Sequence, residues 1–275
     1  PIAIVRDGHR TLLKWHRARR RYDDAPFTAQ RIREGLQAGA SLEVDLRIHR
    51  ERGFALLHDD KLRHDTDGRG KVARTSAAKL RTLQLRDPGG RPTDHRVLLL
   101  DDLPGLFARV PIAPSAVLQL DFKQDAKALD ERSLTSFATA TAAIAPNLIL
   151  SCGDAEAVRI LTDAVPAMQV GYDPCHRGAV DRVLESGAFA AFVDDACAAS
   201  PRATTIYLEI RLVLAAAQRG TDLVAAFAER GRTVDAYTFP GQAHPSWRPT
   251  LDELLNLRIG QLTVDDPEGI VALLR

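Results

Sequence analysis

Residues 41–60 read S-L-E-V-D-L-R-I-H-R-E-R-G-F-A-L-L-H-D-D and contain two β-rich runs, 41–46 and 54–59. Only about seven residues separate these runs, whereas a crossover between parallel strands needs about a dozen or more. The second run is therefore predicted to fold back as an antiparallel partner of the first, with Gly53 near the turn. The charged, Gly- and Pro-rich stretch 61–96 is predicted to be an insertion over one end of the fold.

Outside this hairpin, β-rich runs alternate with Ala- and Leu-rich helical runs, which predicts a parallel sheet covered by helices. Eight such strands in 275 residues fit a single (β/α)8 TIM-type barrel domain, a fold of about 250 residues. An open, doubly wound sheet is the alternative. The predicted strands are 12–15, 41–46, 117–122, 148–152, 167–172, 204–209, 233–239 and 261–265, and the helices are 28–38, 155–164, 178–185, 221–229 and 251–257.

The composition limits the classes of partner. Lys and Arg number 37 against 36 Asp and Glu, a net charge of +1, whereas nucleic-acid binders concentrate basic residues. No apolar run approaches the roughly 20 residues that cross a bilayer. The three cysteines form no Cys-x-x-Cys pair, as is typical of reduced thiols. We expect a cytoplasmic protein with no nucleic-acid partner and no membrane span; its oligomeric state is open.

Carboxylates gather at the predicted strand ends, where TIM barrels carry their active sites. Glu43 and Asp45 are two residues apart on one strand, so their side chains share a face and repel each other unless a cation lies between them. Asp121, on the next predicted parallel strand, supplies a third carboxylate. These oxygen ligands predict a divalent cofactor, Mg²⁺ or Ca²⁺.

Other polar residues at strand ends suit phosphoryl chemistry. His16 ends the first predicted strand and His58 ends the hairpin, and imidazole titrates near neutral pH, as a general acid or base requires. Lys123 shares a face with Asp121, so it either pairs with that carboxylate or donates to an anionic substrate oxygen. A cation would polarise the oxygens of a phosphate ester, while one histidine activates a nucleophile and the other protonates the departing alkoxide.

The same residues resemble the glycerophosphodiester phosphodiesterase family, whose members are TIM-type barrels. The run L-E-V-D-L at 42–46 is similar to the family's E-x-D strand, H-D at 58–59 to a strand end, and T-D-G-R-G-K-V at 66–72 to its insertion. His-Arg at 16–17 resembles the end of the family's opening strand, and T-V-D-D-P-E at 263–268 resembles its closing T-D-x-P. The resemblance spans nearly the whole chain and is weak between residues 154 and 232.

The resemblance implies a role for each of these residues. It implies an acid–base pair of His16 and His58, phosphate binding by Arg17 and Lys123, and metal binding by Glu43, Asp45 and Asp121. Asp121 would replace a glutamate of the family by a shorter carboxylate.

The chain also departs from the family pattern. Its Pro-Glu-Asn-Thr segment reads A-P-F-T at 25–28, so Pro26 and Phe27 replace residues that organise the metal and phosphate site. The glycine after His-Arg is Ala18 here. The basic run 17–21 is either a solvated loop or an anion-attracting rim.

The hypothesis is metal-dependent hydrolysis of a small-molecule phosphodiester, similar to a glycerophosphodiester of lipid metabolism, by a histidine pair whose acid and base roles the spacing does not assign. One alternative is attack by a substrate hydroxyl to give a cyclic phosphate, as in enzymes of the sphingomyelinase D type. Others are a catalytically silent relative that binds a phosphorylated ligand, and a barrel that acts on a non-phosphate substrate. The alcohols of the substrate and the preferred ion are open.

Overall fold

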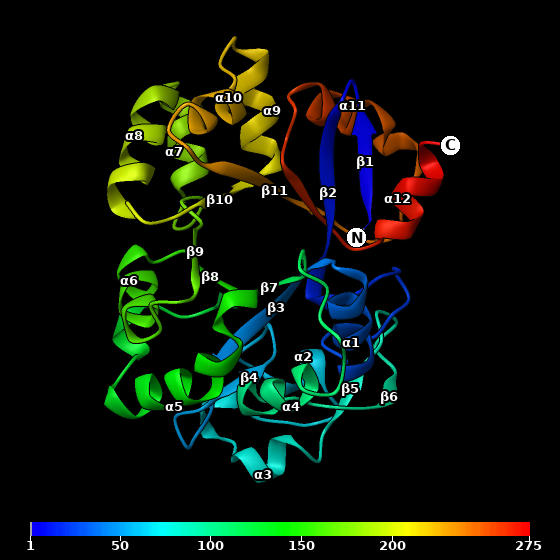
Figure 1. The fold of residues 1–275 in the computed structure, drawn as a ribbon, viewed down its shortest axis with the longest axis vertical. Coiled ribbons are helices and arrows are strands. Elements are labelled where there is room, and N and C mark those ends of the chain that lie inside the picture. Colours follow the sequence, from blue (N-terminus) through cyan, green and yellow to red (C-terminus); the bar gives the residue numbers. More distant parts are fainter. Residues whose placement is uncertain (1) are drawn as a thin grey trace.

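The computed structural model describes residues 2–275 and shows a closed barrel of eight parallel strands (Figure 1). Around the barrel, β2 is followed by β12, β11, β10, β9, β8, β7 and β3, and β3 pairs back onto β2 through Trp15 and Leu42. The predicted (β/α)8 fold is thus confirmed, and the open sheet is excluded because no edge is left between these strands. The strands are β2 (His9–Trp15), β3 (Ser41–Ile48), β7 (Val117–Phe122), β8 (Leu148–Cys152), β9 (Gln169–Tyr172), β10 (Thr205–Glu209), β11 (Thr233–Phe239) and β12 (Gln261–Val264).

Two antiparallel strands extend the barrel sheet. β4 (Phe54–Leu56) pairs with β3 through Leu46 opposite Leu56, so the predicted hairpin is confirmed. β1 (Ala3–Arg6) pairs with β2 and was not predicted. The turn between β1 and β2 is Asp7-Gly8, where both residues have positive φ; Asp-Gly between two strands is a strong hairpin signal.

The predicted helices are present with shifted ends. α1 (Ala29–Ala38) begins after Thr28, whose side chain accepts a hydrogen bond from the Arg31 N–H at 3.2 Å, and it buries Ile32 and Leu36. The others are α6 (Ala155–Ala164), α7 (Ala179–Ser186), α10 (Leu223–Ala228) and α11 (Arg248–Asn256). Further helices are α4 (Leu103–Phe107), α5 (Glu131–Thr141), α8 (Phe189–Ala199), α9 (Ile210–Gln218) and α12 (Pro267–Leu273).

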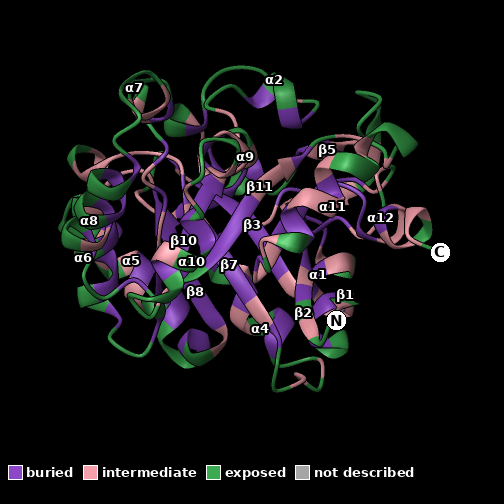
Figure 2. Cartoon of the chain, turned by 90° about the horizontal axis from the view of Figure 1, so that it is seen from above, coloured by how far each residue is buried: buried purple, intermediate pink, exposed green. Residues whose placement is uncertain are grey.

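The insertion 61–96 has its own small structure. It contains α2 (Leu62–Asp65), α3 (Ala77–Leu80) and a two-stranded antiparallel sheet of β5 (Gln84–Arg86) and β6 (Pro92–Arg96). Figure 2 shows α2 and β5 toward the same upper side of the molecule as α7, which follows β9. The insertion therefore borders the barrel end at which the parallel strands terminate.

Side chains of β3 alternate between two environments. Leu42, Val44 and Leu46 are fully buried in the hydrophobic core, and Leu42 packs so closely on α1 that a Cβ at Gly35 would lie 2.5 Å from it. Glu43 and Asp45, between them, lie on the other face of the strand, as a period of two requires. Parallel strands are covered on both faces, so these carboxylic side chains are buried although they are ionisable.

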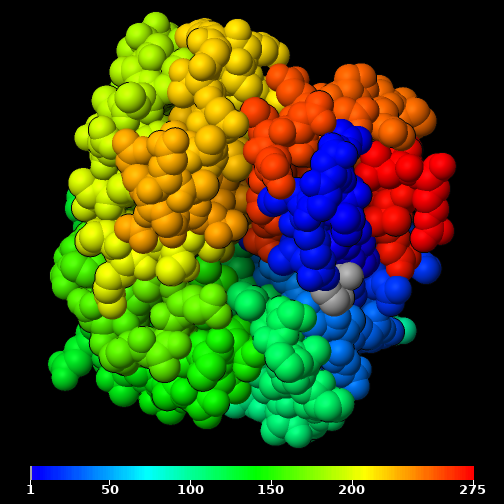
Figure 3. All heavy atoms as spheres, turned by 45° about the horizontal axis from the view of Figure 1, so that its top comes forward, coloured from blue at the N-terminus to red at the C-terminus, as the bar shows by residue number. Residues whose placement is uncertain are grey.

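The two chain ends lie side by side. Figure 3 shows the first strands, in blue, beside the C-terminal segment, in red, and α12 contacts β2. No helix among residues 2–275 is long and apolar enough to cross a membrane.

Candidate active site

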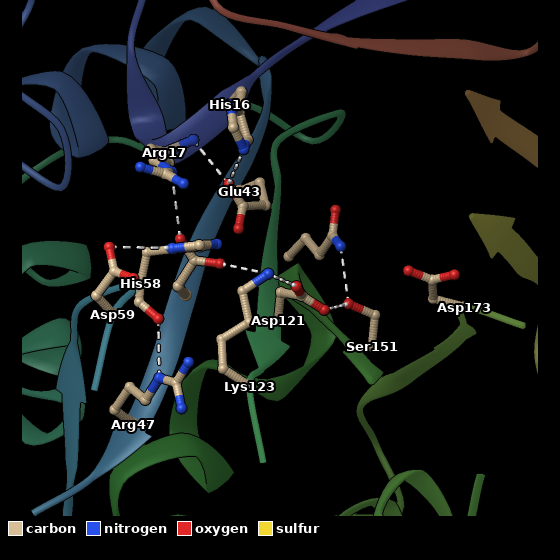
Figure 4. Close-up of polar contacts among 12 residues, drawn as sticks. His16, Arg17, Glu43, Arg47, His58, Asp59, Asp121, Lys123, Ser151 and Asp173 are labelled. Atoms are coloured by element: carbon tan, nitrogen blue, oxygen red, sulfur yellow. Dashed lines mark hydrogen bonds and ion pairs between the residues drawn. The ribbon is translucent and has the colours of Figure 1, made fainter. Parts of the chain in front are cut away.

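Three carboxylates from two neighbouring strands meet inside the barrel end. Asp45 on β3 lies in register with Asp121 on β7, and Glu43 precedes Asp45 by two residues on the same face. One oxygen from each of the three side chains lies within 4.8 Å of the others. The structure thus brings together the residues that the sequence analysis selected as metal ligands (Figure 4).

Burial and mutual repulsion shape the charge of this cluster. Burial, reinforced by the negative charge of Asp45, raises the pKa of Glu43 well above its usual range. Burial also acts to raise the pKa of Asp45, but Lys123 and Arg17 outweigh it and hold that pKa well below its ordinary value. Asp45 is therefore the ionised member, and Glu43 tends to keep its proton unless more positive charge arrives.

Lys123 links two of the carboxylates. Its Nζ lies 2.6 Å from Asp121 Oδ2 and 3.0 Å from Asp45 Oδ1. Burial acts to lower the pKa of Lys123, but the surrounding carboxylates, Asp121 first, raise it well above its ordinary value. The ammonium group is thus permanently charged and faces the carboxylate cluster. Both interpretations of Lys123 remain compatible with this position, since a partly exposed ammonium can also reach a ligand oxygen.

Arg17 lies on the opposite side of Asp45. It occupies the short helix η1 (His16–Ala18) with a φ of 54°, and its backbone N–H donates to Glu43 Oε2 at 2.7 Å. Its Nε lies 3.5 Å from Asp45 Oδ2. The left-handed turn therefore lets one residue contact both carboxylates of β3, through its backbone and through its guanidinium.

The residues that depart from the family pattern occupy strained or buried places. Ala18 has a φ of 56°, the left-handed region that favours the glycine expected there, and its methyl group is fully buried. Phe27 also has a positive φ, donates its N–H to the Arg17 carbonyl at 2.8 Å, and buries its whole ring in the core. Phe27 thus supports the Arg17 turn from the apolar side, where the family has an amide.

His16 is held by a carboxylate from the last barrel strand. Its Nδ1 lies 2.6 Å from Asp265 Oδ1, and its Nε2 faces Glu43 Oε2 at 3.9 Å. Burial acts to raise the pKa of Asp265, but the hydrogen bond from His16 and the nearby Arg19 lower it to about 2. An ionised carboxylate only accepts hydrogen bonds, so Nδ1 of His16 must carry the proton.

The same contacts leave Nε2 of His16 free to act as a base. Burial lowers the pKa of His16 below its ordinary value of 6.5, although Asp265 acts in the opposite direction. The imidazole is therefore neutral at neutral pH, and its lone pair on Nε2 points toward Glu43 and the interior of the site.

His58 follows β4 and is positioned through its backbone. Asp65, in the insertion helix α2, accepts hydrogen bonds from the N–H groups of His58 and Asp59 at 3.0 Å each. The His58 carbonyl accepts from Arg47 Nε at 2.8 Å. The ring stays half-exposed, with Nδ1 3.5 Å from Asp59 Oδ2. The insertion thus fixes the loop that carries His58 while leaving the imidazole at the mouth of the site.

Much of the basic run 17–21 is held in ion pairs. Arg19, which is buried, pairs with Asp265, and the more exposed Arg20 and Arg21 both pair with Glu268 at the start of α12. These three arginines thus meet two carboxylates that lie far away in sequence. Of the run, only Arg17 faces the carboxylate cluster.

A buried hydrogen-bond chain supports Asp121 from below. Ser151 Oγ donates to Asp121 Oδ1 at 2.6 Å, and Gln119 Nε2 donates to Ser151 Oγ at 2.8 Å. The Gln119 carbonyl accepts from Lys14 Nζ, which also pairs with Asp235 at 2.5 Å. Because a lysine only donates and a carboxylate only accepts, the direction of every hydrogen bond in this chain is determined. Asp121 is thereby held with Oδ1 toward Ser151 and Oδ2 toward Lys123.

A second titratable group lies across the site, at the end of β9. Asp173 accepts hydrogen bonds from Tyr237 Oη and His176 Nε2, both at 2.8 Å. The hydrogen bond to Asp173 raises the pKa of His176, and burial raises the pKa of Tyr237 far above its ordinary value. Tyr237 is therefore a neutral hydrogen-bond donor that borders the same site as His16 and His58.

These groups surround a hollow of about 250 Å³ at the barrel end. Asp45, which is fully buried, does not line it and lies behind Glu43 and Lys123. A small anionic group in this hollow would lie among three imidazoles, an ammonium and a guanidinium. The lining includes His16, Arg17, Glu43, His58, Asp121, Lys123, His176 and Tyr237.

The carboxylate cluster fits a hard divalent cation. Among residues 2–275, the two buried oxygens of Asp45 form no hydrogen bond and meet only the ion-pair contacts of Lys123 and Arg17, so both keep lone pairs that a metal ion could use. Glu43 and Asp121 add carboxylate oxygens at a mutual spacing that one ion can span, and oxygen donors are those that Mg²⁺ and Ca²⁺ prefer. A bound cation would also relieve the repulsion that raises the pKa of Glu43.

Sequence reasoning missed the residues that act on the selected ones from a distance. Asp265 was recognised as a polar strand end, but its contact with His16 was not predicted. Asp65, Gln119 and Asp173 were also missed. Asp65 ends the short helix α2 and Asp173 follows β9 as a polar loop residue does. Gln119 is a polar side chain among apolar neighbours in β7, which is the signal that could have found it.

Comparison with known proteins gives matches at the level of structure. No family model matches the sequence, and no curated protein matches it. A glycerophosphoryl diester phosphodiesterase from Parabacteroides distasonis is 18% identical over 99% of this chain and 89% of its own, with a TM-score of 0.69.

Two further solved structures show the same likeness. A phosphodiesterase from Oleispira antarctica, in complex with the product sn-glycerol-3-phosphate, is 17% identical over 96% of both chains, with a TM-score of 0.68. A glycerophosphodiester phosphodiesterase from Thermotoga maritima is 16% identical over 96% of this chain and 99% of its own, with a TM-score of 0.65. At these identities the likeness establishes a shared barrel fold.

Proposed function

We propose that this chain is a metal-dependent phosphodiesterase of the glycerophosphodiester phosphodiesterase family that hydrolyses a glycerophosphodiester-like small molecule. The observation that carries the proposal is that three carboxylates close enough to share one cation lie at the barrel end, beside a hollow lined by two histidines and two cationic side chains that point to the same site. The barrels of similar structure, among them one solved with sn-glycerol-3-phosphate, support the same reaction class.

Glu43, Asp45 and Asp121 would hold the cation. When bound, a divalent ion supplies Lewis-acid polarisation of a phosphate oxygen. The protein's own contribution is to keep the ligand oxygens in place: Ser151 and Lys123 orient Asp121, and the Arg17 backbone N–H orients Glu43.

His16 acts as the general base. Its Nδ1 proton is held by Asp265 at 2.6 Å, and burial keeps the ring neutral by lowering its pKa. The Nε2 lone pair is therefore available to accept the proton of an attacking hydroxyl. Asp265 then stabilises the imidazolium that forms, as a carboxylate behind a catalytic histidine does in hydrolytic triads.

His58 acts as the general acid that protonates the departing alcohol. It approaches the hollow from the side of the insertion, on a different strand end from His16. Two histidines on separate elements can serve the two ends of an in-line displacement, and each would contribute about 100- to 10,000-fold. Arg17 and Lys123 stabilise the negative charge of the phosphate between them.

The attacking hydroxyl is proposed to be water. A hydroxyl of the substrate itself would give a cyclic phosphate instead, and the two products differ in their phosphorus NMR shift. The same measurement therefore identifies the reaction and its nucleophile.

The test is turnover of glycerophosphocholine, followed by phosphorus NMR with added Mg²⁺ or Ca²⁺ and with a chelator. Metal-dependent release of glycerol phosphate supports the proposal, and binding without turnover under every ion contradicts it. His16→Ala and His58→Ala should each remove nearly all turnover. The matched control is His64→Ala, an exposed histidine in the insertion helix α2. Retention of more than about a tenth of activity in either active-site variant would contradict the assigned acid–base pair.

A further inference from the structure

Two more hollows adjoin the candidate active site on the side of β8 and β9. The middle hollow has a volume of about 250 Å³ and shares Asp121, Lys123 and His176 with the active-site hollow. The outer hollow, of about 490 Å³, shares Gly153, Arg177 and again His176 with the middle one. A continuous depression therefore runs from the carboxylate cluster to the surface between α7 and α8.

The chemistry of the lining changes along this depression. The middle hollow is bordered by polar groups, among them Gln124, Asp125 and Asp154. The outer hollow is bordered mostly by hydrocarbon side chains, including Tyr172, Pro174, Val183, Ala188, Ala191 and Phe192. Charged side chains border it too, namely those of Asp154, Arg177, Arg182 and Asp195. A ligand that fits the whole depression would carry a phosphate, then a polar group and then an apolar one.

We infer that the outer hollow binds a hydrocarbon chain of the substrate, so that the preferred phosphodiester is a glycerophosphodiester that still carries one acyl chain. This inference rests on the proposed function and names the substrate class for that site. The phosphate lies at the carboxylate cluster, the glycerol in the polar middle hollow, and the acyl chain between α7 and α8.

The side chain that borders all three hollows, that of His176, is held in one position. His176, which lines all three, is fixed by its hydrogen bond to Asp173 at 2.8 Å. It lies so close to the loop after β8 that a Cβ at Gly153 would come within 2.2 Å of its ring. Because the glycine lets the imidazole lie against this loop, His176 borders the depression with little freedom to move into it.

Helix α8 provides the apolar floor through small side chains. Its residues Ala191 and Ala199 are exposed and line the outer hollow, while Phe192 is buried beneath them. The same helix buries three aromatic or β-branched side chains, which cover the core. Its exposed alanines are small and therefore leave room for a ligand above them. A bulky side chain at Ala191 should therefore fill the hollow without disturbing the barrel.

The test uses ligands that bind but contain no diester to cleave. Glycerol phosphate and its butanoyl, hexanoyl and octanoyl esters are titrated calorimetrically into the full chain with Mg²⁺ present. In the wild-type protein the Kd should fall with chain length, by up to about fourfold per methylene that becomes buried, the counterpart of about 0.8 kcal/mol. The competing hypothesis, that the hollow binds a partner protein, predicts that Kd does not depend on the length of the acyl chain.

Two tryptophan variants of α8 locate the chain. Ala191→Trp should flatten the dependence of Kd on chain length, whereas Ala198→Trp, on an exposed position of α8 outside the hollow, should leave it as in the wild type. Circular dichroism and thermal midpoints confirm that both variants are folded. Equal Kd values for all four ligands, no binding of any ester, or an unchanged dependence in Ala191→Trp would overturn the inference. Turnover of glycerophosphocholine, which has no acyl chain, judges the proposed function separately.

Discussion

Replacing Asp265 by asparagine tests how His16 is made a base. The substitution keeps the size of the side chain and a hydrogen-bond acceptor beside His16 Nδ1, but it removes the negative charge 2.6 Å away. The neutral imidazole loses little, because its N–H can still donate to the amide oxygen. The imidazolium that forms when Nε2 takes a proton loses its anionic partner, so the transition state is destabilised more than the ground state.

The expected size of the effect follows from the geometry. Two unit charges about 4 Å apart interact by about 4 kcal/mol at the effective dielectric of about 20 that suits partly buried pairs. The side chains of His16 and Asp265 are only 19% and 11% exposed, so solvent screens the pair weakly. Each 1.36 kcal/mol corresponds to about a tenfold change in rate. Part of the interaction survives as a hydrogen bond to the amide, so we expect kcat/KM to fall about 100- to 1,000-fold.

The assay compares kcat/KM on glycerophosphocholine for Asp265→Asn and for Asp266→Asn. Asp266 is the matched control because it is adjacent in sequence but accepts N–H groups of Ala243 and Gly269 at the start of α12, away from His16. The Asp266→Asn substitution should lower kcat/KM by less than about threefold. The control for folding is a thermal midpoint close to that of the wild type. In such a folded Asp265→Asn protein, a fall in kcat/KM of less than about tenfold would refute the assignment of His16 as the base.

Three further outcomes are expected. Because burial lowers the pKa of His16 below 6.5, its base form predominates above that pH, and the acid limb of the pH profile of kcat/KM should lie below pH 6.5; an acid limb above pH 7 would contradict this. Asp65→Ala leaves two partly buried N–H groups in the His58 loop without an acceptor, so urea unfolding should show a loss of about 1 kcal/mol or more together with a lower kcat, and an unchanged midpoint would count against it. Gln119→Leu breaks the hydrogen-bond chain between Lys14 and the metal ligands, so calorimetry should show Mg²⁺ affinity reduced about 10- to 100-fold; wild-type affinity would show that the chain does not position them.

The barrel itself could be predicted because its signals are local. Strands in a covered parallel sheet are short apolar runs, and the helices between them have their own periodicity and caps, so the order of elements follows from the sequence. The hairpin of β3 and β4 followed from chain length alone, since seven residues between the predicted runs do not complete a crossover. The hairpin of β1 and β2 was missed although Asp7-Gly8 signals its turn, because residues 2–6 were not considered as a strand.

The helices α8 and α9 were missed for a different reason. Both are rich in alanine and follow other elements after short turns, so no charged face distinguished them from the loops around them. Their positions matter for function, because α8 provides the apolar hollow beside the site. The sequence does not show whether an alanine of a helix faces solvent or a binding site, because this depends on its neighbours in space.

The gathering of the site residues was also predictable, whereas their protonation and orientation were not. Alternation along β3 places Glu43 and Asp45 on one face, and in-register pairing with β7 brings Asp121 beside them. The proposal of His16 as the base rests instead on Asp265, which is 249 residues from His16 in sequence. The ion pairs of the basic run 17–21 could not be predicted for the same reason, since its partners Asp265 and Glu268 come from the other end of the chain.

The sequence by itself determined the barrel and which side chains meet at its end, because strand periodicity and the order of elements act over a few residues. The tertiary structure alone decided how those side chains are charged and held. Ring closure through β12 and β2 brings Asp265 to His16, and the insertion brings Asp65 to the His58 loop. Electrostatic energies depend on distances in space and on burial, and neither is encoded in the spacing of residues along the chain.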